Sequence, residues 1–179
     1  MKRILGVLAV GLVVLALQGA LATILPPSLC PDLGLLYVLA VGLCWEGAAS
    51  GLVVAAVLGY TADILSGSMF GQHALLRLMV FSATSLAGRK LNLRGALPLI
   101  SFAAAVCVVY ALGAGLLTAF FWGDEVLRPR WLADLLPQTV ATAVLAPWTS
   151  SAVAWLWAWL GDDGAGRRSL QLDARGRVT

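Results

Sequence analysis

The sequence predicts an all-α fold, a polytopic integral membrane bundle of about six transmembrane helices. Of its 179 residues, 60% are hydrophobic and 12% are charged, whereas soluble domains are roughly half apolar and about a quarter charged. The mean hydropathy is +0.91. The apolar residues form runs of about 20, the length that a helix needs to cross roughly 30 Å of hydrocarbon. These observations exclude a soluble, disordered or disulfide-built domain.

Charges, proline and glycine clusters and interfacial tryptophans divide the chain into spans. Pro26 and Pro27 close the first, and the turn at 66–68 ends the third. The second is short unless it begins within 28–32, the fourth carries Arg77, and the fifth and sixth are uncharged. The expected spans are 4–25, 33–45, 47–65, 73–88, one within 95–123 and one within 135–161.

The last residues of the chain differ in composition from the spans. Residues 162–179 mix Gly, Arg and Asp without periodicity. Such a segment buries too little apolar surface to fold by itself. We therefore expect a membrane domain at 1–161, followed by a flexible cytoplasmic tail.

The distribution of Lys and Arg predicts that both termini lie in the cytoplasm. With six spans and a cytoplasmic N terminus, nine of the twelve basic residues fall on the cytoplasmic side, where basic residues near span ends are retained. Basic residues beside apolar runs report topology, so we expect membrane lipid around the chain and no nucleic-acid partner. The first span also resembles a cleavable secretion signal, and cleavage would leave five spans. Its length favours an uncleaved helix.

Small residues at every fourth position predict where helices pack closely. In the third span Gly47, Gly51, Ala55 and Gly59 form one ridge, and Asp63 is next on it. The fifth and sixth spans carry similar ridges. Lipid gives no hydrophobic drive for helix association, so packing needs small residues that let backbones approach. We expect these three spans to form the tight centre of the bundle, while the Leu-rich first span faces lipid or a partner helix.

Asp63 is the most informative ionisable residue, because a carboxylate within a span is costly and is a candidate functional group. The favoured interpretation is a structural ion pair that fixes the outer corner of the bundle, and the alternative is a proton or substrate site. It lies near the C-terminal end of its helix, where the macrodipole disfavours negative charge. We expect Arg77, at the same membrane level in the next span, to pair with it, and His73 to join them. Asp32 and Glu46 precede the second and third spans, where a carboxylate caps a helix N terminus.

Two catalytic interpretations of these residues have little support. Asp32 and Asp63 resemble the pair of an intramembrane aspartyl protease, but nothing in the sequence specifies a shared, water-accessible cleft. Ser66 or Ser68 with His73 resembles a serine protease dyad, but the serines lie in a glycine-flanked turn, where serine is common. The sequence contains no zincin, Walker A or nucleophile-elbow motif. We expect a protein that is not an enzyme and that uses no cofactor or metal.

Two local motifs resemble the bacterial MreD family of rod shape-determining proteins. A Pro-Asp pair precedes the second span, and an Asp-x-x-Ser-Gly segment leads through a further glycine into the fourth. The residues that carry the resemblance are Pro31, Asp32, Asp63, Ser66, Gly67 and Gly71.

The resemblance implies a non-enzymatic scaffold of the cell-elongation complex in the bacterial inner membrane, where lateral peptidoglycan is made. Its implied partners are MreC, by direct contact, and MreB, the RodA glycosyltransferase and a class B penicillin-binding protein within the complex. The resemblance also implies a fold similar to the substrate-binding component of energy-coupling-factor transporters.

The alternative is a protein of another class, the small-molecule (vitamin-like) binding subunit of a membrane transporter. That function needs a polar cavity near the outer face, closed by the connection between the third and fourth spans. Gly67 and Gly71 would make this connection mobile. A ligand that copurifies with the protein would favour transport, and an empty protein that captures MreC would favour the scaffold.

Overall fold

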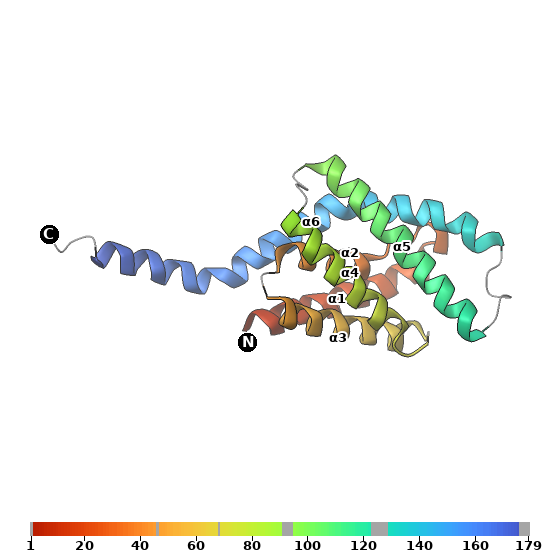
Figure 1. Ribbon diagram of the computed structural model, residues 1–179, viewed down its shortest axis with the longest axis horizontal. Coiled ribbons are helices and arrows are strands. Elements are labelled where there is room, and N and C mark those ends of the chain that lie inside the picture. The colour runs from red at the N-terminus through yellow and green to blue at the C-terminus, as the bar shows by residue number, and fades with distance from the viewer. Residues whose placement is uncertain (1, 46, 68, 91–94, 123–128, 176–179) are drawn as a thin grey trace.

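The computed structural model describes residues 2–45, 47–67, 69–90, 95–122 and 129–175. Every regular element in these ranges is a helix, as the composition predicts (Figure 1). The elements are α1 (Lys2–Ile24), the short 3-10 helix η1 (Pro27–Leu29), α2 (Leu33–Cys44), α3 (Ala48–Ser66), α4 (Gln72–Lys90), α5 (Ala96–Trp122) and α6 (Pro129–Arg175).

Within the residues that the structure describes, four stretches of helix have the length and hydropathy to cross a membrane. α2 is equally apolar but has only 12 residues, about 18 Å at 1.5 Å per residue. α4 has 19 residues, and it carries Arg77 in its second turn and Arg89 and Lys90 in its last turn. The four long stretches are Lys2–Ile24, Ala48–Ser66, Ala96–Phe121 and Leu135–Leu160.

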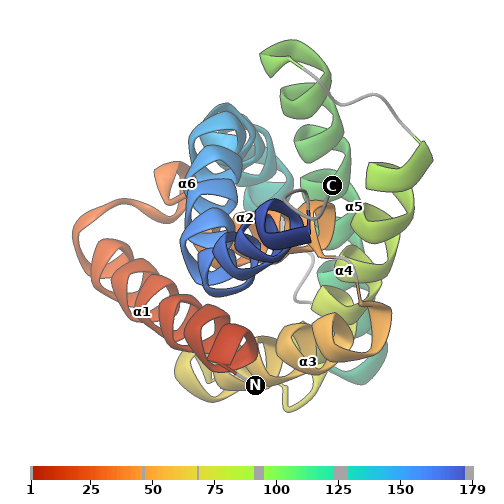
Figure 2. The ribbon, with the colours of Figure 1, turned by 90° about the vertical axis from the view of Figure 1, so that its left-hand side faces the viewer.

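The short α2 forms the centre of the bundle, and the other helices surround it (Figure 2). Each residue from Gly34 to Gly42 is buried. The expectation that the third, fifth and sixth spans form the centre is therefore wrong. A helix that is apolar all round is buried on every side. With 12 residues, α2 is too short to reach both membrane surfaces by itself.

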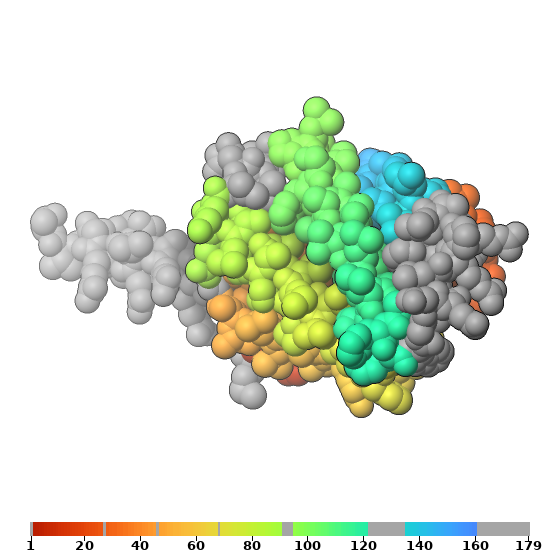
Figure 3. Space-filling view, turned by 45° about the vertical axis from the view of Figure 1, so that its right-hand side comes forward, coloured from red at the N-terminus to blue at the C-terminus, as the bar shows by residue number. Residues whose placement is uncertain are grey.

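The ridge of small residues on α3 faces α4, and these two helices make the most extensive contact in the bundle. Gly51, Ala55 and Gly59 are buried. A Cβ atom at Gly59 would lie 2.8 Å from the backbone nitrogen of Ala74, so only glycine allows the two backbones to approach this closely. Gly47 precedes α3 as its exposed N-cap residue. α4 in turn lies beside α5 on one face of the molecule (Figure 3).

The start of α1 and the position of Leu160 in α6 lie at the same end of the bundle. Arg3 Nε donates a 3.4 Å hydrogen bond to the carbonyl of Leu160, and the Arg3 guanidinium lies 5.7 Å from the ring centre of Trp157. Trp157 packs against Trp45, with 4.8 Å between ring centres. Leu160 therefore lies at the end of the bundle where α1 starts, and the cytoplasmic location of the termini stays a prediction.

The last helix extends beyond the bundle (Figure 1). α6 contains Pro137 and Pro147 and continues to Arg175, past the expected end of the sixth span. The flexibility of residues 162–179 stays a prediction.

Candidate functional site

A polar cluster lies where α3 turns into α4, at the end of the bundle opposite the N terminus. Its centre is Asp63, which is 0% exposed. One carboxylate oxygen accepts hydrogen bonds from the backbone nitrogens of Gly71 and Ala74, at 2.9 and 3.3 Å, and the other accepts from that of His73, at 2.8 Å. N–H groups at the start of a helix have no partner within it. The carboxylate therefore meets the positive end of the α4 dipole, which stabilises its charge.

The turn between α3 and α4 depends on two glycines. Gly67 ends α3 with a φ of 64°, and Gly71 has a φ of 92°. Both values lie in the left-handed region, which side chains disfavour and glycine tolerates. Ser66 Oγ donates a 3.4 Å hydrogen bond to the carbonyl of Asp63. The Asp-x-x-Ser-Gly segment therefore reverses the chain at this end of the bundle.

Arg77 pairs with Asp32, which corrects the expected pair with Asp63. Arg77 is 2% exposed, and its Nη2 lies 3.8 Å from Asp32 Oδ1. Its Nη1 donates a 2.9 Å hydrogen bond to the carbonyl of Leu58. The physical reason is that the first N–H groups of α4 already supply the positive potential that Asp63 needs. A Cβ atom at Gly34 would overlap the guanidinium, so this glycine of α2 leaves room for it.

Asp32 caps α2, as the sequence predicts. Its Oδ1 accepts a 2.8 Å hydrogen bond from the backbone nitrogen of Leu35, and its own backbone nitrogen donates to Thr142 Oγ1 at 3.1 Å. Pro31, immediately before it, fixes the backbone that enters the cap. The Pro-Asp pair therefore starts α2 and joins it to α6. Glu46, the other predicted cap, lies outside the described residues.

His73 joins the cluster to α5. Its backbone N–H reaches Asp63, while its ring nitrogen Nδ1 lies 2.6 Å from the hydroxyl oxygen of Tyr110. The two rings stack with 6.0 Å between centres and 13° between planes. The neighbouring Gln72 donates from Nε2 to the carbonyl of Ala114 at 3.0 Å. The start of α4 is thus held by polar contacts from both sides.

The residues of the two catalytic interpretations have structural partners here. The carboxylates of Asp32 and Asp63 each accept hydrogen bonds from the start of a helix. The Ser66 hydroxyl donates to a carbonyl, and the His73 ring contacts Tyr110. Ser68 lies outside the described residues.

A polar cavity of about 280 Å³ lies beside this cluster. Residues from α1, α2, α4, α5 and α6 and the cap Asp32 form its wall, and they lie toward the end of the bundle that carries the α3–α4 turn. The polar members of the wall are Gln18, Asp32, His73, Tyr110, Gln138, Thr139 and Thr142, and the apolar members are Leu35, Cys107, Ala111, Ala114 and Leu135.

Sequence reasoning missed several residues of this cavity. Gln18 is the clearest example, since its Oε1 accepts a 2.8 Å hydrogen bond from the backbone nitrogen of Gly34. The signal that could have found it is a single amide within an otherwise apolar span. Tyr110 and Thr142 carry a weaker signal, because hydroxyl side chains are common in membrane helices.

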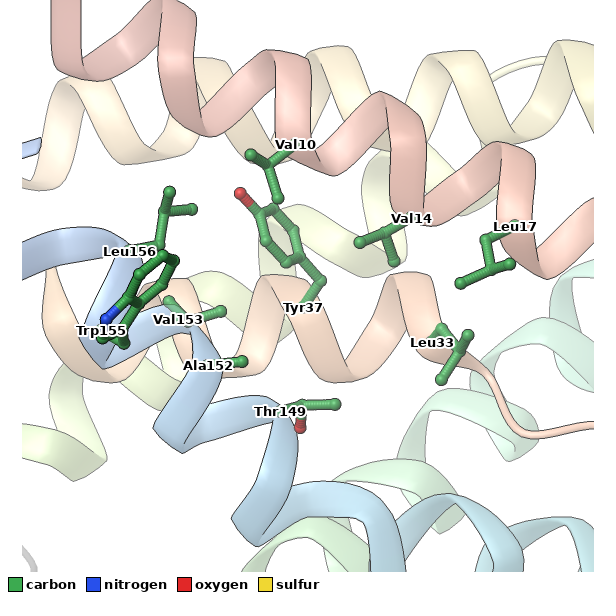
Figure 4. A pocket seen from close by; sticks show the side chains of 10 residues that line it. All are labelled: Val10, Val14, Leu17, Leu33, Tyr37, Thr149, Ala152, Val153, Trp155 and Leu156. Atoms are coloured by element: carbon green, nitrogen blue, oxygen red, sulfur yellow. The ribbon is translucent and has the colours of Figure 1, made fainter. Parts of the chain in front are cut away.

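A second, apolar groove of about 420 Å³ lies between α1, α2 and α6. Figure 4 shows the α1 side chains facing Tyr37 of α2 and the side chains of α6 across an open space. The Tyr37 hydroxyl donates a 2.7 Å hydrogen bond to the carbonyl of Val7, so the ring presents its carbon atoms to the groove. The lining residues are Val10, Val14, Leu17, Leu33, Tyr37, Thr149, Ala152, Val153, Trp155 and Leu156.

Comparison with known proteins identifies a family for this architecture. A family model described as rod shape-determining protein MreD matches residues 2–153. The match includes the Pro-Asp cap, the Asp-x-x-Ser-Gly turn and the α1 wall of the groove. Neither a curated protein nor a solved structure matches the chain, so the expected similarity to energy-coupling-factor components stays a prediction.

Proposed function

The chain belongs to the MreD family of rod shape-determining proteins, and from this premise we propose that it is a non-enzymatic scaffold of the cell-elongation complex. In this role it binds the single membrane span of MreC. Through MreC it helps to place MreB, RodA and a class B penicillin-binding protein where lateral peptidoglycan is made. The mechanism is contact geometry within the inner membrane, without turnover.

The proposed orientation places the N-terminal end of the bundle in the cytoplasm. Arg3 lies at that end, and α4, which starts in the Asp63 cluster, finishes away from it with Arg89 and Lys90. Basic residues that flank spans remain on the cytoplasmic side. The Asp63 cluster and the polar cavity would then lie toward the outer face, where MreC extends into the periplasm.

The observation that carries the scaffold proposal is the unfilled apolar groove along α1. α1 is covered on one side only, and Leu5, Val13 and Leu17 are 65%, 67% and 54% exposed. Within lipid, helices associate through van der Waals packing, and a groove between helices provides surface for it. The one tyrosine hydroxyl in the wall is already bonded to Val7. The occupant that fits is therefore a wholly apolar helix, and we assign it to the span of MreC.

Photocrosslinking in intact cells tests this assignment. A benzophenone amino acid at Val14 lies in the groove, and one at Met79 lies in a comparable apolar groove of about 320 Å³ between α4 and α5. We expect an adduct with MreC from position 14 and none from position 79. An adduct with lipid or with a second copy of the chain at position 14, or with MreC at position 79 instead, would overturn the assignment.

A filling substitution gives an independent test with a matched control. Ala152 and Ala83 are both exposed alanines, the first in the α1 groove and the second in the α4–α5 groove. We expect Ala152→Trp to reduce copurification of MreC and to round the cells, whereas Ala83→Trp should preserve both. The membrane level of each variant shows whether it folds.

The transporter subunit stays a second candidate function, favoured by the polar cavity. It would require the connection between α3 and α4 to open and close. The hydrogen bonds that Asp63 of α3 accepts from Gly71 and His73 tie that connection and the start of α4 to α3, which favours the scaffold. A vitamin-like compound retained through detergent extraction, with no capture of MreC, would reverse this preference.

A further inference from the structure

The docking of MreC on α1 leaves the polar cavity unexplained, and we propose that this cavity binds a small, uncharged molecule with amide or hydroxyl groups. The inference goes beyond the scaffold function and does not depend on which partner fills the groove. The volume of about 280 Å³ lies just below the range of roughly 300 to 1,000 Å³ that holds drug-sized ligands. The ligand is therefore small.

The first argument is the convergence of polar side chains from separate helices. Gln18 comes from α1, His73 from α4, Tyr110 from α5 and Gln138 from α6, and they line one space. Polar groups in the membrane region are costly unless they have hydrogen-bond partners. A concave site with apolar walls and a few convergent polar groups is the usual form of a small-molecule site.

The second argument is hydrogen-bonding capacity that the protein does not use. Gln18 accepts through Oε1 from Gly34, which leaves its two amide N–H donors. Asp32 uses Oδ1 for the cap of α2 and for Arg77, and its Oδ2 has no partner in the part of the chain that the structure describes. The amide of Gln138 likewise makes no hydrogen bond to the described residues. The cavity therefore offers both donors and acceptors.

The third argument is charge. Among the side chains that the structure describes, no Lys or Arg lines the cavity, so a phosphate or carboxylate ligand would face the Asp32 carboxylate without one of these cations to bind it. A cationic ligand would compete with Arg77, which lies 3.8 Å from Asp32 and already balances its charge. Bringing like charges together, or breaking a buried ion pair, is strongly unfavourable. An uncharged ligand avoids both costs.

Cys107 lines the cavity and is 6% exposed, which makes it a native reporter. The chain has three cysteines, so Cys30→Ala with Cys44→Ala leaves this thiol alone. The full chain, purified in nanodiscs, is treated with uncharged methyl methanethiosulfonate or with its anionic sulfonatoethyl analogue. We expect the uncharged reagent to react about tenfold faster, after correction for its rate with a free thiol. Equal corrected rates, or no reaction at all, would overturn the proposal.

Protection of Cys107 then tests binding with two uncharged probes, N-methylacetamide and glycerol. At about twice the Kd of a probe, mass action predicts labelling that is about threefold slower. Acetate, the anionic control, should give no protection. Protection by acetate, or by neither uncharged probe at any concentration that the protein tolerates, would show that the cavity holds water only.

A pair of variants links protection to the wall of the cavity. Gln138→Leu removes an exposed amide that lines it, and Ser151→Ala removes an exposed hydroxyl elsewhere on α6. In Gln138→Leu we expect Cys107 to stay reactive but the uncharged probes to give no protection. In Ser151→Ala we expect the probes to protect Cys107 as they do in the unchanged protein. Undiminished protection in Gln138→Leu would contradict the site. Copurification of MreC should be the same for both variants, which separates this site from the scaffold function.

Discussion

The backbone N–H of His73 donates a 2.8 Å hydrogen bond to the carboxylate of Asp63. This bond joins the last turn of α3 to the first turn of α4. Two further N–H groups, of Gly71 and Ala74, reach the same carboxylate. A charge that would be costly at the C-terminal end of α3 is thereby stabilised by the N-terminal end of α4. The Asp63 carboxylate therefore holds the α3–α4 hairpin closed.

Asp63→Leu should destabilise the protein by about 3 kcal/mol, because it leaves three buried N–H groups without an acceptor. Asp63→Asn should cost less, since one acceptor oxygen remains. Thermal unfolding of the purified chain in detergent measures both changes. Equal unfolding temperatures for the two variants and the unchanged protein would contradict the role of the carboxylate. In cells, Asp63→Leu should lose rod-shape support, and normal rods at normal membrane levels would count against it.

Gly59→Ala should separate α3 from α4, because the added Cβ would lie 2.8 Å from the backbone nitrogen of Ala74. A backbone cannot move aside as a side chain can, so we expect a loss of about 1 to 3 kcal/mol. Gly19→Ala on α1 is the control, since nothing lies within 4 Å of its added Cβ. The comparison uses unfolding temperatures in the same detergent. A similar small effect for both variants would show that the ridge does not set the helix spacing.

The local features of the fold follow from the sequence, since each depends on neighbours along the chain. The Asp32 cap, the left-handed Gly67 and the ridge through Gly59 are signals of this kind. Helix limits follow as well, with α2 and α3 beginning and ending within a residue of their expected spans. Such features need no knowledge of how the helices are placed.

The features that the sequence did not predict depend on which helix faces which. Arg77 was expected to pair with Asp63 because both lie in one hairpin, but α2 passes between the other helices and brings Asp32 to it. Spacing along the chain carries no information about this crossing. For the same reason Gln18 and Tyr110, from helices far apart in sequence, could not be assigned to one cavity.

The Asp32–Arg77 pair should show strong energetic coupling. Arg77→Met alone leaves a partly buried carboxylate, and Asp32→Asn alone leaves a buried guanidinium, so each should cost about 3 kcal/mol or more. The double variant should cost less than the sum, because no uncompensated charge remains. Asn also caps helices, so the cap of α2 is retained in the two variants that carry Asp32→Asn. A double-mutant cycle on unfolding free energies measures the coupling, and simple additivity would contradict the ion pair.

Cys30 and Cys44 report the proposed orientation of the bundle. Cys30 lies in the connection between α1 and α2, and Cys44 is the last residue of α2 at the opposite end. A maleimide that does not cross membranes, added to intact spheroplasts, should label Cys30, while Cys44 should require permeabilisation. Burial and the neighbouring Asp32 carboxylate raise the pKa of the Cys30 thiol. Labelling at neutral pH should therefore be slower than for an ordinary exposed thiol and should quicken as the pH rises.

Single-cysteine variants separate orientation from reactivity in this experiment. Cys44→Ala and Cys30→Ala each leave one of the two sites, and Cys107→Ala in both backgrounds removes the thiol of the cavity. Asp32→Asn should quicken the labelling of Cys30 without changing the side from which it occurs, since it removes one of the two causes of the raised pKa. If Cys44 were labelled from outside and Cys30 were protected, the bundle would have the opposite orientation to the one proposed. The Asp63 cluster and the cavity would then face the cytoplasm, where a periplasmic partner cannot reach them.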